Sequence, residues 1–160
     1  MEAVCREMEF PYEEENGVLK FRVALDSMDV QVITWGQLRD VAQVIVRLQV
    51  RAKTDFRAQC GEFLHRLNFG TRRKLWEMDY DDGEVRLAAY YDTIAGPLTG
   101  GILKSLLHYL FVTADAVFPY LTSVLSGRMT AEFAADQAEA AITALWDDGE
   151  EKVEEEPDDS

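Results

Sequence analysis

The residues best equipped for chemistry are two cysteines, two histidines and a set of carboxylates, and their spacing decides whether they can act together. Cys60 and His65 are the nearest thiol and imidazole, residue types that pair in cysteine nucleophiles because the ring takes the thiol proton. Positions five apart on a helix point in different directions, and Cys60 falls on the apolar face of a predicted helix. We therefore expect no such pair. We place His65 and His108 at the surface or its boundary, and Cys5 in a mobile start of the chain.

Metal and phosphate sites find equally little support. A zinc site needs about four converging ligands, and the two histidines lie on separate predicted elements without a Cys or acid cluster at ligand spacing. The carboxylates of Asp79, Asp81, Asp82 and Glu84 suit a solvated turn and do not continue into a calcium loop. The glycines between Gly96 and Gly101 lack the spacing of a phosphate-binding loop. The sequence predicts no catalytic residue, no metal and no cofactor.

Aromatic residues are the one group that favours a function. Trp and Tyr are frequent anchors of protein interfaces, and we expect five of them on strands, some within the core. Helices on one side of an antiparallel sheet leave the other side uncovered, and apolar residues there would meet a partner or a second copy. The candidate protein-interaction surface is Trp35, Trp76, Tyr80, Tyr90 and Tyr91.

The elements that must position these residues begin with strands. Apolar and polar residues alternate from Gly17 to Leu25, from Met28 to Thr34 and from Val41 to Arg51, with turns at Asp26-Ser27 and Gly36-Gln37. The short connections predict an antiparallel three-strand meander. Residues 1–16 are expected to form a short helix or a mobile segment.

A helical period follows, and then a hairpin. Phe56, Cys60, Phe63, Leu64 and Leu67 form one apolar stripe, which Thr54 or Asp55 would cap and Asn68 and Gly70 would end. Between Lys74 and Tyr91 two alternating strands surround Asp82-Gly83, a pair that favours a tight turn with both residues at positive φ.

Helices complete the predicted domain. One runs from Leu98 to Val117, and Pro119 either kinks it or separates it from a segment ending at Ser126-Gly127. Thr130 caps a last helix from Ala131 to Trp146, whose apolar stripe is Phe133, Ala134, Ala138, Ala141, Ile142 and Leu145. The fold class is therefore α+β, with an antiparallel sheet of about five strands and helices packed on one face, as a single domain over residues 17–146.

Charge excludes several partners. The net charge is −14, and Asp147 to Ser160 holds nine acids and one base, so residues 147–160 are expected to be a disordered acidic tail. A mildly acidic body disfavours nucleic acid, and we expect Arg72, Arg73 and Lys74 on an exposed edge or loop. Charged residues interrupt the apolar stretch from Ile102 to Leu125, so no membrane span is expected. Without a secretion signal, the cytoplasm is the expected location.

The segment from Phe63 to Asn68, followed by the Trp76 to Leu87 hairpin, resembles the YbjN-like family of bacterial proteins. So does the pattern Thr113-Ala114-Asp115 with Phe118-Pro119-Tyr120-Leu121, and the resemblance covers roughly Gly17 to Trp146. It implies a type III secretion chaperone-like fold, a dimer, and a non-enzymatic regulatory or chaperone-like role assigned to sensory transduction. The short first helix and the acidic tail depart from the family pattern.

The leading hypothesis is a non-enzymatic protein-interaction module that buries an apolar segment of a partner, or a second copy in a homodimer, against the sheet or the Leu98 to Leu125 helices. The alternative is an enzyme or small-ligand binder, which would show a concave pocket with converging polar groups and perturbed titration. A third interpretation makes the acidic tail a nucleic-acid mimic or a contact for a basic partner.

Overall fold

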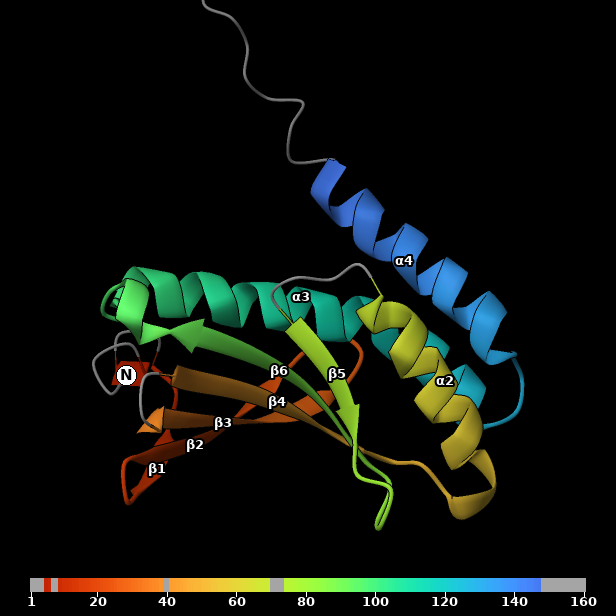
Figure 1. Ribbon diagram of the computed structural model, residues 1–160, viewed down its shortest axis with the longest axis horizontal. Helices are drawn as coiled ribbons and strands as arrows, with labels where there is room; N and C mark the ends of the chain where they lie inside the picture. Colours follow the sequence, from red (N-terminus) through yellow and green to blue (C-terminus); the bar gives the residue numbers. More distant parts are fainter. Residues whose placement is uncertain (1–4, 7–8, 39–40, 70–73, 148–160) are drawn as a thin grey trace, which may run out of the picture.

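The computed structural model describes residues 5–6, 9–38, 41–69 and 74–147 (Figure 1). Six strands form one antiparallel sheet in the order β1-β2-β3-β4-β6-β5. The strands are β1 (Tyr12–Glu15), β2 (Val18–Ala24), β3 (Asp29–Leu38), β4 (Val41–Arg51), β5 (Lys74–Met78) and β6 (Glu84–Asp92). The helices are α2 (Arg57–Asn68), α3 (Gly100–Leu125) and α4 (Ala131–Asp147), with 3₁₀ turns at Thr54–Phe56 and Thr93–Ala95. The α+β class, with helices on one face of an antiparallel sheet, is confirmed.

The sheet is larger than the sequence predicted, because β1 lies in the segment expected to be helical or mobile. Glu15 pairs with Val18 across a turn in which Asn16 and Gly17 both have positive φ. The three glutamates of β1 concealed this edge strand, since their side chains show no alternation. The predicted turn at Gly36-Gln37 is instead a register irregularity within β3, between Trp35 and Leu38. Cys5 is 1% exposed and belongs to the core, so its placement in a mobile start was wrong.

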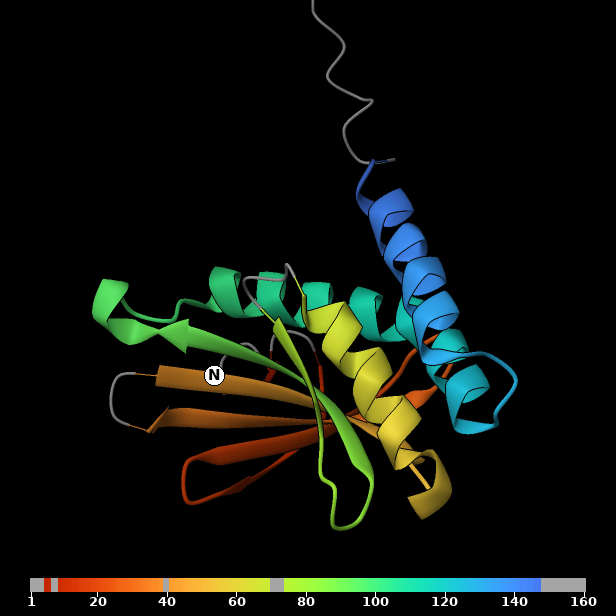
Figure 2. The same ribbon diagram turned by 45° about the vertical axis from the view of Figure 1, so that its right-hand side comes forward.

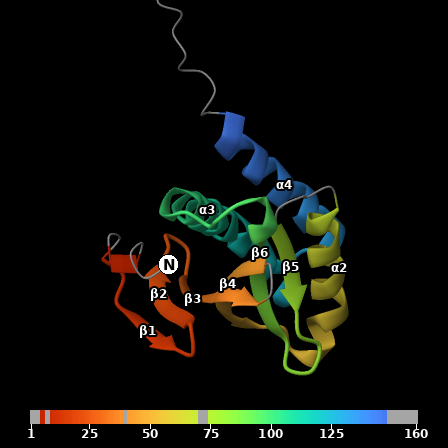
Figure 3. The ribbon, with the colours of Figure 1, turned by 60° about the vertical axis from the view of Figure 1, so that its left-hand side comes forward.

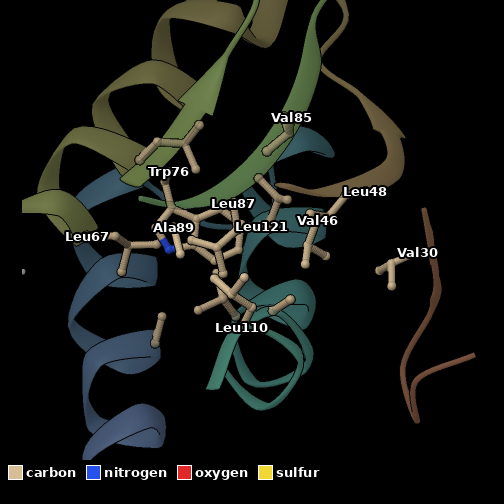
Figure 4. Packing of buried hydrophobic residues seen from close by; sticks show 14 of the residues in the cluster. Val30, Val46, Leu48, Leu67, Trp76, Val85, Leu87, Ala89, Leu110 and Leu121 are labelled. Atoms are coloured by element: carbon tan, nitrogen blue, oxygen red, sulfur yellow. The ribbon is translucent and has the colours of Figure 1, made fainter. Parts of the chain in front are cut away.

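The core lies between the sheet and the helices (Figures 1 and 2). Figure 4 shows side chains of β4 and β6, among them Val46 and Leu87, pointing towards Leu110 and Leu121 of α3. The buried stripe of α3 is Leu103, Leu107, Leu110, Thr113, Ala114, Val117, Leu121 and Val124. Its spacing of three and four residues keeps one helix face against the sheet.

Pro119 does not break α3, which is one continuous helix of 26 residues. Proline has no N–H to donate to the carbonyl four positions earlier, which is that of Asp115. The turn between β2 and β3 lies beside this carbonyl: the Ser27 hydroxyl is 3.4 Å from its oxygen, and the Ser27 backbone N–H donates to the side-chain Oδ1 of Asp115 at 2.8 Å. A second, very short bond joins the Ser27 hydroxyl to the same carboxylate. The sheet and α3 are thus tied together beside the proline.

The β5–β6 hairpin turns over four residues, Tyr80 to Gly83, which is longer than predicted. Asp79 and Glu84 close it through Asp79 N–H to Glu84 O at 2.9 Å, and of the predicted pair only Gly83 has positive φ, 77°. The backbone carbonyl of Ala52 occupies the place that a Cβ at position 83 would need. Gly83 O in turn accepts from Ala52 N–H at 2.8 Å, so the hairpin tip is fixed to the end of β4.

α2 covers the outer edge of the hairpin. The Asn68 side chain accepts from Trp76 N–H at 2.7 Å and donates to Trp76 O at 2.8 Å, so it binds both outward-facing groups of that residue in the edge strand β5. The start of α2 differs from expectation. A 3₁₀ turn precedes the helix, and neither Thr54 nor Asp55 makes a side-chain cap bond. Gly70, expected to end the helix, lies outside the described residues.

α4 begins as predicted, with Thr130 Oγ1 accepting from Phe133 N–H at 3.3 Å. Its buried stripe is made of alanines, Ala131, Ala134, Ala135 and Ala138, which allow close approach to α2 and α3. Phe133 and Leu145, expected in that stripe, are 53% and 47% exposed. The last turns of α4 extend away from the sheet (Figures 1 and 2). The predicted acidic tail after Asp147 lies outside the described residues.

Candidate functional site

The five aromatic residues proposed as an interaction surface do not come together. Trp76 is 3% exposed in the core, where Figure 4 shows it near Leu67. Tyr80 lies in the hairpin turn rather than on a strand, with its hydroxyl against Gly61 of α2. Tyr91 is half-buried on the helix-covered side, Tyr90 is exposed on the other, and Trp35 lies in β3 opposite Val18 and Gln43.

The sheet face turned away from the helices (Figure 3) carries a small apolar cluster of Ile33, Ile45 and Ala88. All three side chains are 5% exposed or less, because longer neighbours close over them. Those neighbours are largely polar: Arg86 Nε donates to Glu77 at 2.6 Å, and the Tyr90 hydroxyl donates to the same carboxylate at 2.9 Å. Burial raises the pKa of Tyr90, and the hydrogen bond to the Glu77 carboxylate raises it further. The open face therefore presents this charged network beside the exposed side chains of Leu75 and Tyr90.

A groove on the other side of the molecule is lined largely by apolar side chains. It has a volume of about 790 Å³ and runs along the first third of α3 to the last turn of α4. Its lining is Thr99, Gly101, Ile102, Ser105, Leu106, His108, Tyr109 and Trp146, which we call the α3 groove. The rings of Tyr109 and Trp146 pack at a tilt of 34°, with centroids 5.4 Å apart, and join the two helices at the groove.

The groove exists because α3 is apolar on two faces. Leu103, Leu107 and Leu110 are buried against the sheet, while Ile102, Leu106 and Tyr109 form a second stripe that the domain covers only in part. A helix that is apolar on more than one face must be covered on each of them to leave water. By length and composition α3 is also the one helix in the described ranges that would pass as a membrane span, a test that the central helix of a globular core passes too.

Lys74 lies behind the groove and is 4% exposed, so its expected position on an exposed edge was wrong. Its Nζ is 5.0 Å from the centroid of the Tyr109 ring and donates to Thr113 Oγ1 at 3.4 Å. Burial lowers the pKa of Lys74 to about 8, since an ammonium group loses solvation there. Arg72 and Arg73 lie outside the described residues. Lys74 and Trp76 are two residues apart in β5, so strand alternation puts both side chains on the buried face. The run Arg72, Arg73 and Lys74 concealed this signal in the sequence.

Cys60 and the two histidines lie as the sequence predicted, unlike Cys5. Cys60 is fully buried, which raises its pKa to about 11, whereas His65 is exposed on the same helix. Cys5 and Cys60 form no disulfide. Among the residues with described coordinates, no three His, Cys, Asp or Glu side chains gather as metal ligands. His108 is exposed at the α3 groove.

No family model matches the chain, and no curated protein sequence matches it. Three chains among solved structures match, including the crystal structure of YbjN from E. coli, described as a candidate transcription regulator. That match covers 92% of this chain and 90% of that chain, at 9% identity and a TM-score of 0.46. It coincides with the family that the sequence resembles, but a likeness of this size supports no argument about function. The α+β class rests on the sheet and helices described above.

Proposed function

We propose that the protein is a non-enzymatic interaction module that receives an apolar helical segment of a partner protein in the α3 groove. The observation that carries this proposal is the second apolar stripe of α3, Ile102, Leu106 and Tyr109, which faces the groove beside Trp146. Amphipathic helices bind by laying one apolar face into such a groove, and buried Trp and Tyr side chains contribute most of the affinity.

The groove is a better candidate than the open sheet face for a physical reason. Binding gains free energy from apolar area removed from water, roughly 25 cal/mol per Å². Ile33 and Ile45 are already buried, and a partner that covered the exposed Leu75 would also cover the neighbouring Arg86 and Glu77 and would have to replace their solvation. In the groove, Trp146 is still 42% exposed and has apolar area to lose.

The test places a fluorescent reporter in the groove by replacing Ser105 with cysteine and labelling it with a polarity-sensitive dye. The native Cys5 and Cys60 are both buried, and Cys60 also has a raised pKa, so both should react slowly. Addition of a neutral amphipathic helical peptide, with leucines on one face and glutamines on the other, should produce a saturable blue shift. Trp146→Ala should weaken this binding about tenfold or more, as expected for an interface anchor.

The matched control carries the dye at Gln59→Cys, on the exposed side of α2, where no shift is expected. Phe133→Ala is the matched apolar control, because Phe133 is exposed on α4 but does not line the groove. Equal shifts at both dye positions, or equal effects of the two alanine variants, would count against the groove as the binding site.

A small apolar ligand is a second candidate for the same groove. Its volume of about 790 Å³ is in the range of small-molecule sites, and Lys74 with its lowered pKa lies behind Tyr109. A medium-chain fatty acid titrated against the Ser105→Cys reporter separates the candidates. Saturation by the fatty acid at micromolar concentration, with no response to the peptide, would favour the ligand. The cytoplasmic location, the homodimer and the lack of nucleic-acid binding stay predictions.

A further inference from the structure

We propose that the open face of the sheet binds a small phosphate-bearing anion, held by Arg22, Gln31 and Arg47 in a hollow over β2, β3 and β4. The hollow lies on the face turned away from the helices (Figure 3), so the inference does not depend on the α3 groove or on the proposed function. Its volume is about 270 Å³. Its lining, which we call the arginine hollow, is Arg22, Gln31, Arg47, Leu48, Gln49, Val50, Arg51 and Glu84.

The register of the sheet places the three proposed donors in one row. Arg22 of β2 pairs with Gln31 of β3, and Gln31 pairs with Arg47 of β4. The preceding residues Phe21 and Val46 are buried in the core, so strand alternation directs Arg22 and Arg47 to the open face. Two strand spacings, roughly 10 Å, separate the backbones of these two arginines. Their long side chains can therefore reach one anion from opposite sides of Gln31.

The three side chains keep donors that the protein does not use. Arg22 is exposed and makes no hydrogen bond or ion pair within the described part of the chain. Arg47 Nη1 donates to Gln31 Oε1 at 3.3 Å, which leaves the NH₂ group of Gln31 to donate elsewhere. Arg47 Nε is shielded from water and lies 3.0 Å from Glu84 Oε1 without the alignment of a hydrogen bond. An anion above Gln31 would engage these groups.

Positive charge exceeds negative charge in the arginine hollow. Its lining holds three arginines and one carboxylate, that of Glu84, which lies 3.0 Å from Arg47 and 3.6 Å from Arg51. Asp82, outside the lining, forms a further ion pair with Arg51. Three guanidinium groups thus face two carboxylates. The excess charge is that of Arg22, which lies on β2, at the side of the hollow away from these acids.

The acids on the other side of Arg22 belong to β1 and are met by a lysine. Lys20 lies directly opposite Glu13 in the register of β1 and β2, and its Nζ is 3.7 Å from Glu15. These glutamates therefore have a nearer cation than Arg22. The guanidinium group of Arg22 stays available to a ligand.

The arrangement favours phosphate over other anions. The fork of one arginine satisfies a planar carboxylate, whereas a tetrahedral phosphate group presents oxygens in several directions and can accept from three side chains at once. The volume of about 270 Å³ is smaller than that of most drug-sized sites, which suits a phosphate group with a small substituent. The net charge of −14 repels large polyanions, so nucleic acids and acidic proteins are disfavoured as occupants.

The experiment titrates the isotope-labelled full chain with inorganic phosphate or with glycerol 3-phosphate and follows the arginine Nε–H resonances by NMR. Sodium chloride at matched ionic strength is the blank, because screening alone shifts exposed arginines. Saturable shifts of Arg22 and Arg47 in the low millimolar range are expected, and acetate should not saturate there. Both phosphate sources support the proposal. Tighter binding of glycerol 3-phosphate would identify a phosphate ester as the ligand, and tighter binding of inorganic phosphate the free ion.

Matched variants test the site. Arg22→Gln should weaken phosphate binding about fivefold or more, and Arg22→Lys should weaken it less, because lysine keeps the charge and loses the fork. Arg128→Gln, at an exposed arginine outside the hollow, should bind as the wild type does. Glu84→Gln removes the competing carboxylate and should tighten binding several-fold, whereas Glu139→Gln, on the exposed side of α4, should not. Backbone amide spectra check that each variant keeps the fold.

Several results would overturn the proposal. Shifts that chloride reproduces, or equal losses in Arg22→Gln and Arg128→Gln, would mean that no site exists. Acetate binding as tight as phosphate binding would rule out the phosphate class. Equal tightening by Glu84→Gln and Glu139→Gln would reduce the effect to net charge. If Glu84→Gln fails to fold, the Arg22 variants decide alone, since Arg22 is exposed and its replacement should not disturb the core. None of these outcomes bears on the α3 groove.

Discussion

At the scale of single residues, Lys74 shows how a sequence can mislead. It follows two arginines, and such a run usually lies at the surface. Strand alternation with Trp76 outweighs that tendency, and the ammonium group finds the Tyr109 ring and the Thr113 hydroxyl instead of water. The pattern of apolar residues around position 74 therefore predicts burial better than the charge run does.

Lys74 should make stability depend on pH. Burial lowers its pKa from 10.5 to about 8, so the unfolded chain binds more protons than the folded chain between these values. The free energy of unfolding should then rise with pH across this interval, by about 3 kcal/mol. In Lys74→Met the rise should largely disappear, as urea denaturation at pH 7.5, 8.5 and 9.5 would show. Lys53→Met, at an exposed lysine, should keep the wild-type rise, and identical profiles for the two variants would refute the assignment.

At the scale of elements, the strands and helices were predictable where one side is covered and the other is not. β4 was placed at its observed bounds because its alternation is long and rich in β-branched residues. β1 was missed because three consecutive glutamates show no period. The sequence also contains a signal for the α3 groove, because one buried stripe of α3 does not include Ile102, Leu106 and Tyr109, and these form a second apolar stripe. What the sequence did not reveal is that Trp146 reaches Tyr109, which depends on how α4 packs.

The close contact at the hairpin tip can be tested by comparing two glycines that have the same φ but different neighbouring atoms. Gly17 and Gly83 both have φ of 77°, but a Cβ at position 17 would meet nothing within 4 Å, whereas one at position 83 would meet the Ala52 backbone. Gly17→Ala should cost about 1 kcal/mol, the penalty of a left-handed alanine. Gly83→Ala should cost at least about 2 kcal/mol more, because β4 and the turn must separate. Chemical denaturation of both variants measures the difference, and equal losses would mean that the turn moves freely.

At the scale of the whole molecule, the order of the strands was the part that the sequence left open. A hairpin can join a sheet by either of its strands. β6 pairs with β4 because its centre, Leu87 to Ala89, is apolar on both faces and suits an interior position. β5 is shorter and exposes Leu75, as suits an edge. The period of apolar residues predicted the α+β layers. Which hairpin strand pairs with β4 follows instead from comparing how apolar β5 and β6 are.

The bond between Ser27 and Asp115 joins the two layers of the molecule, so its loss should affect global stability. Asp115→Ala removes the carboxylate that accepts from the Ser27 backbone and hydroxyl. The expected cost is about 1 to 2 kcal/mol, the usual value for hydrogen bonds to a charged group near the surface. Asp136→Ala, an exposed acid on α4, removes the same charge and should change stability by less than about 0.5 kcal/mol. Thermal unfolding of both proteins provides the comparison, and similar midpoints would contradict the role given to Asp115.

The amide of Asn68 has a consequence beyond the fold. It hydrogen-bonds both the N–H and the C=O of Trp76 that point outward from the edge strand β5. Another polypeptide could therefore not pair with β5 at Trp76, because those two groups are already bonded. Addition of a further strand at the β5 edge, by which fibrils form and peptides extend a sheet, is thereby disfavoured. A partner protein would instead bind through side-chain contacts between helices.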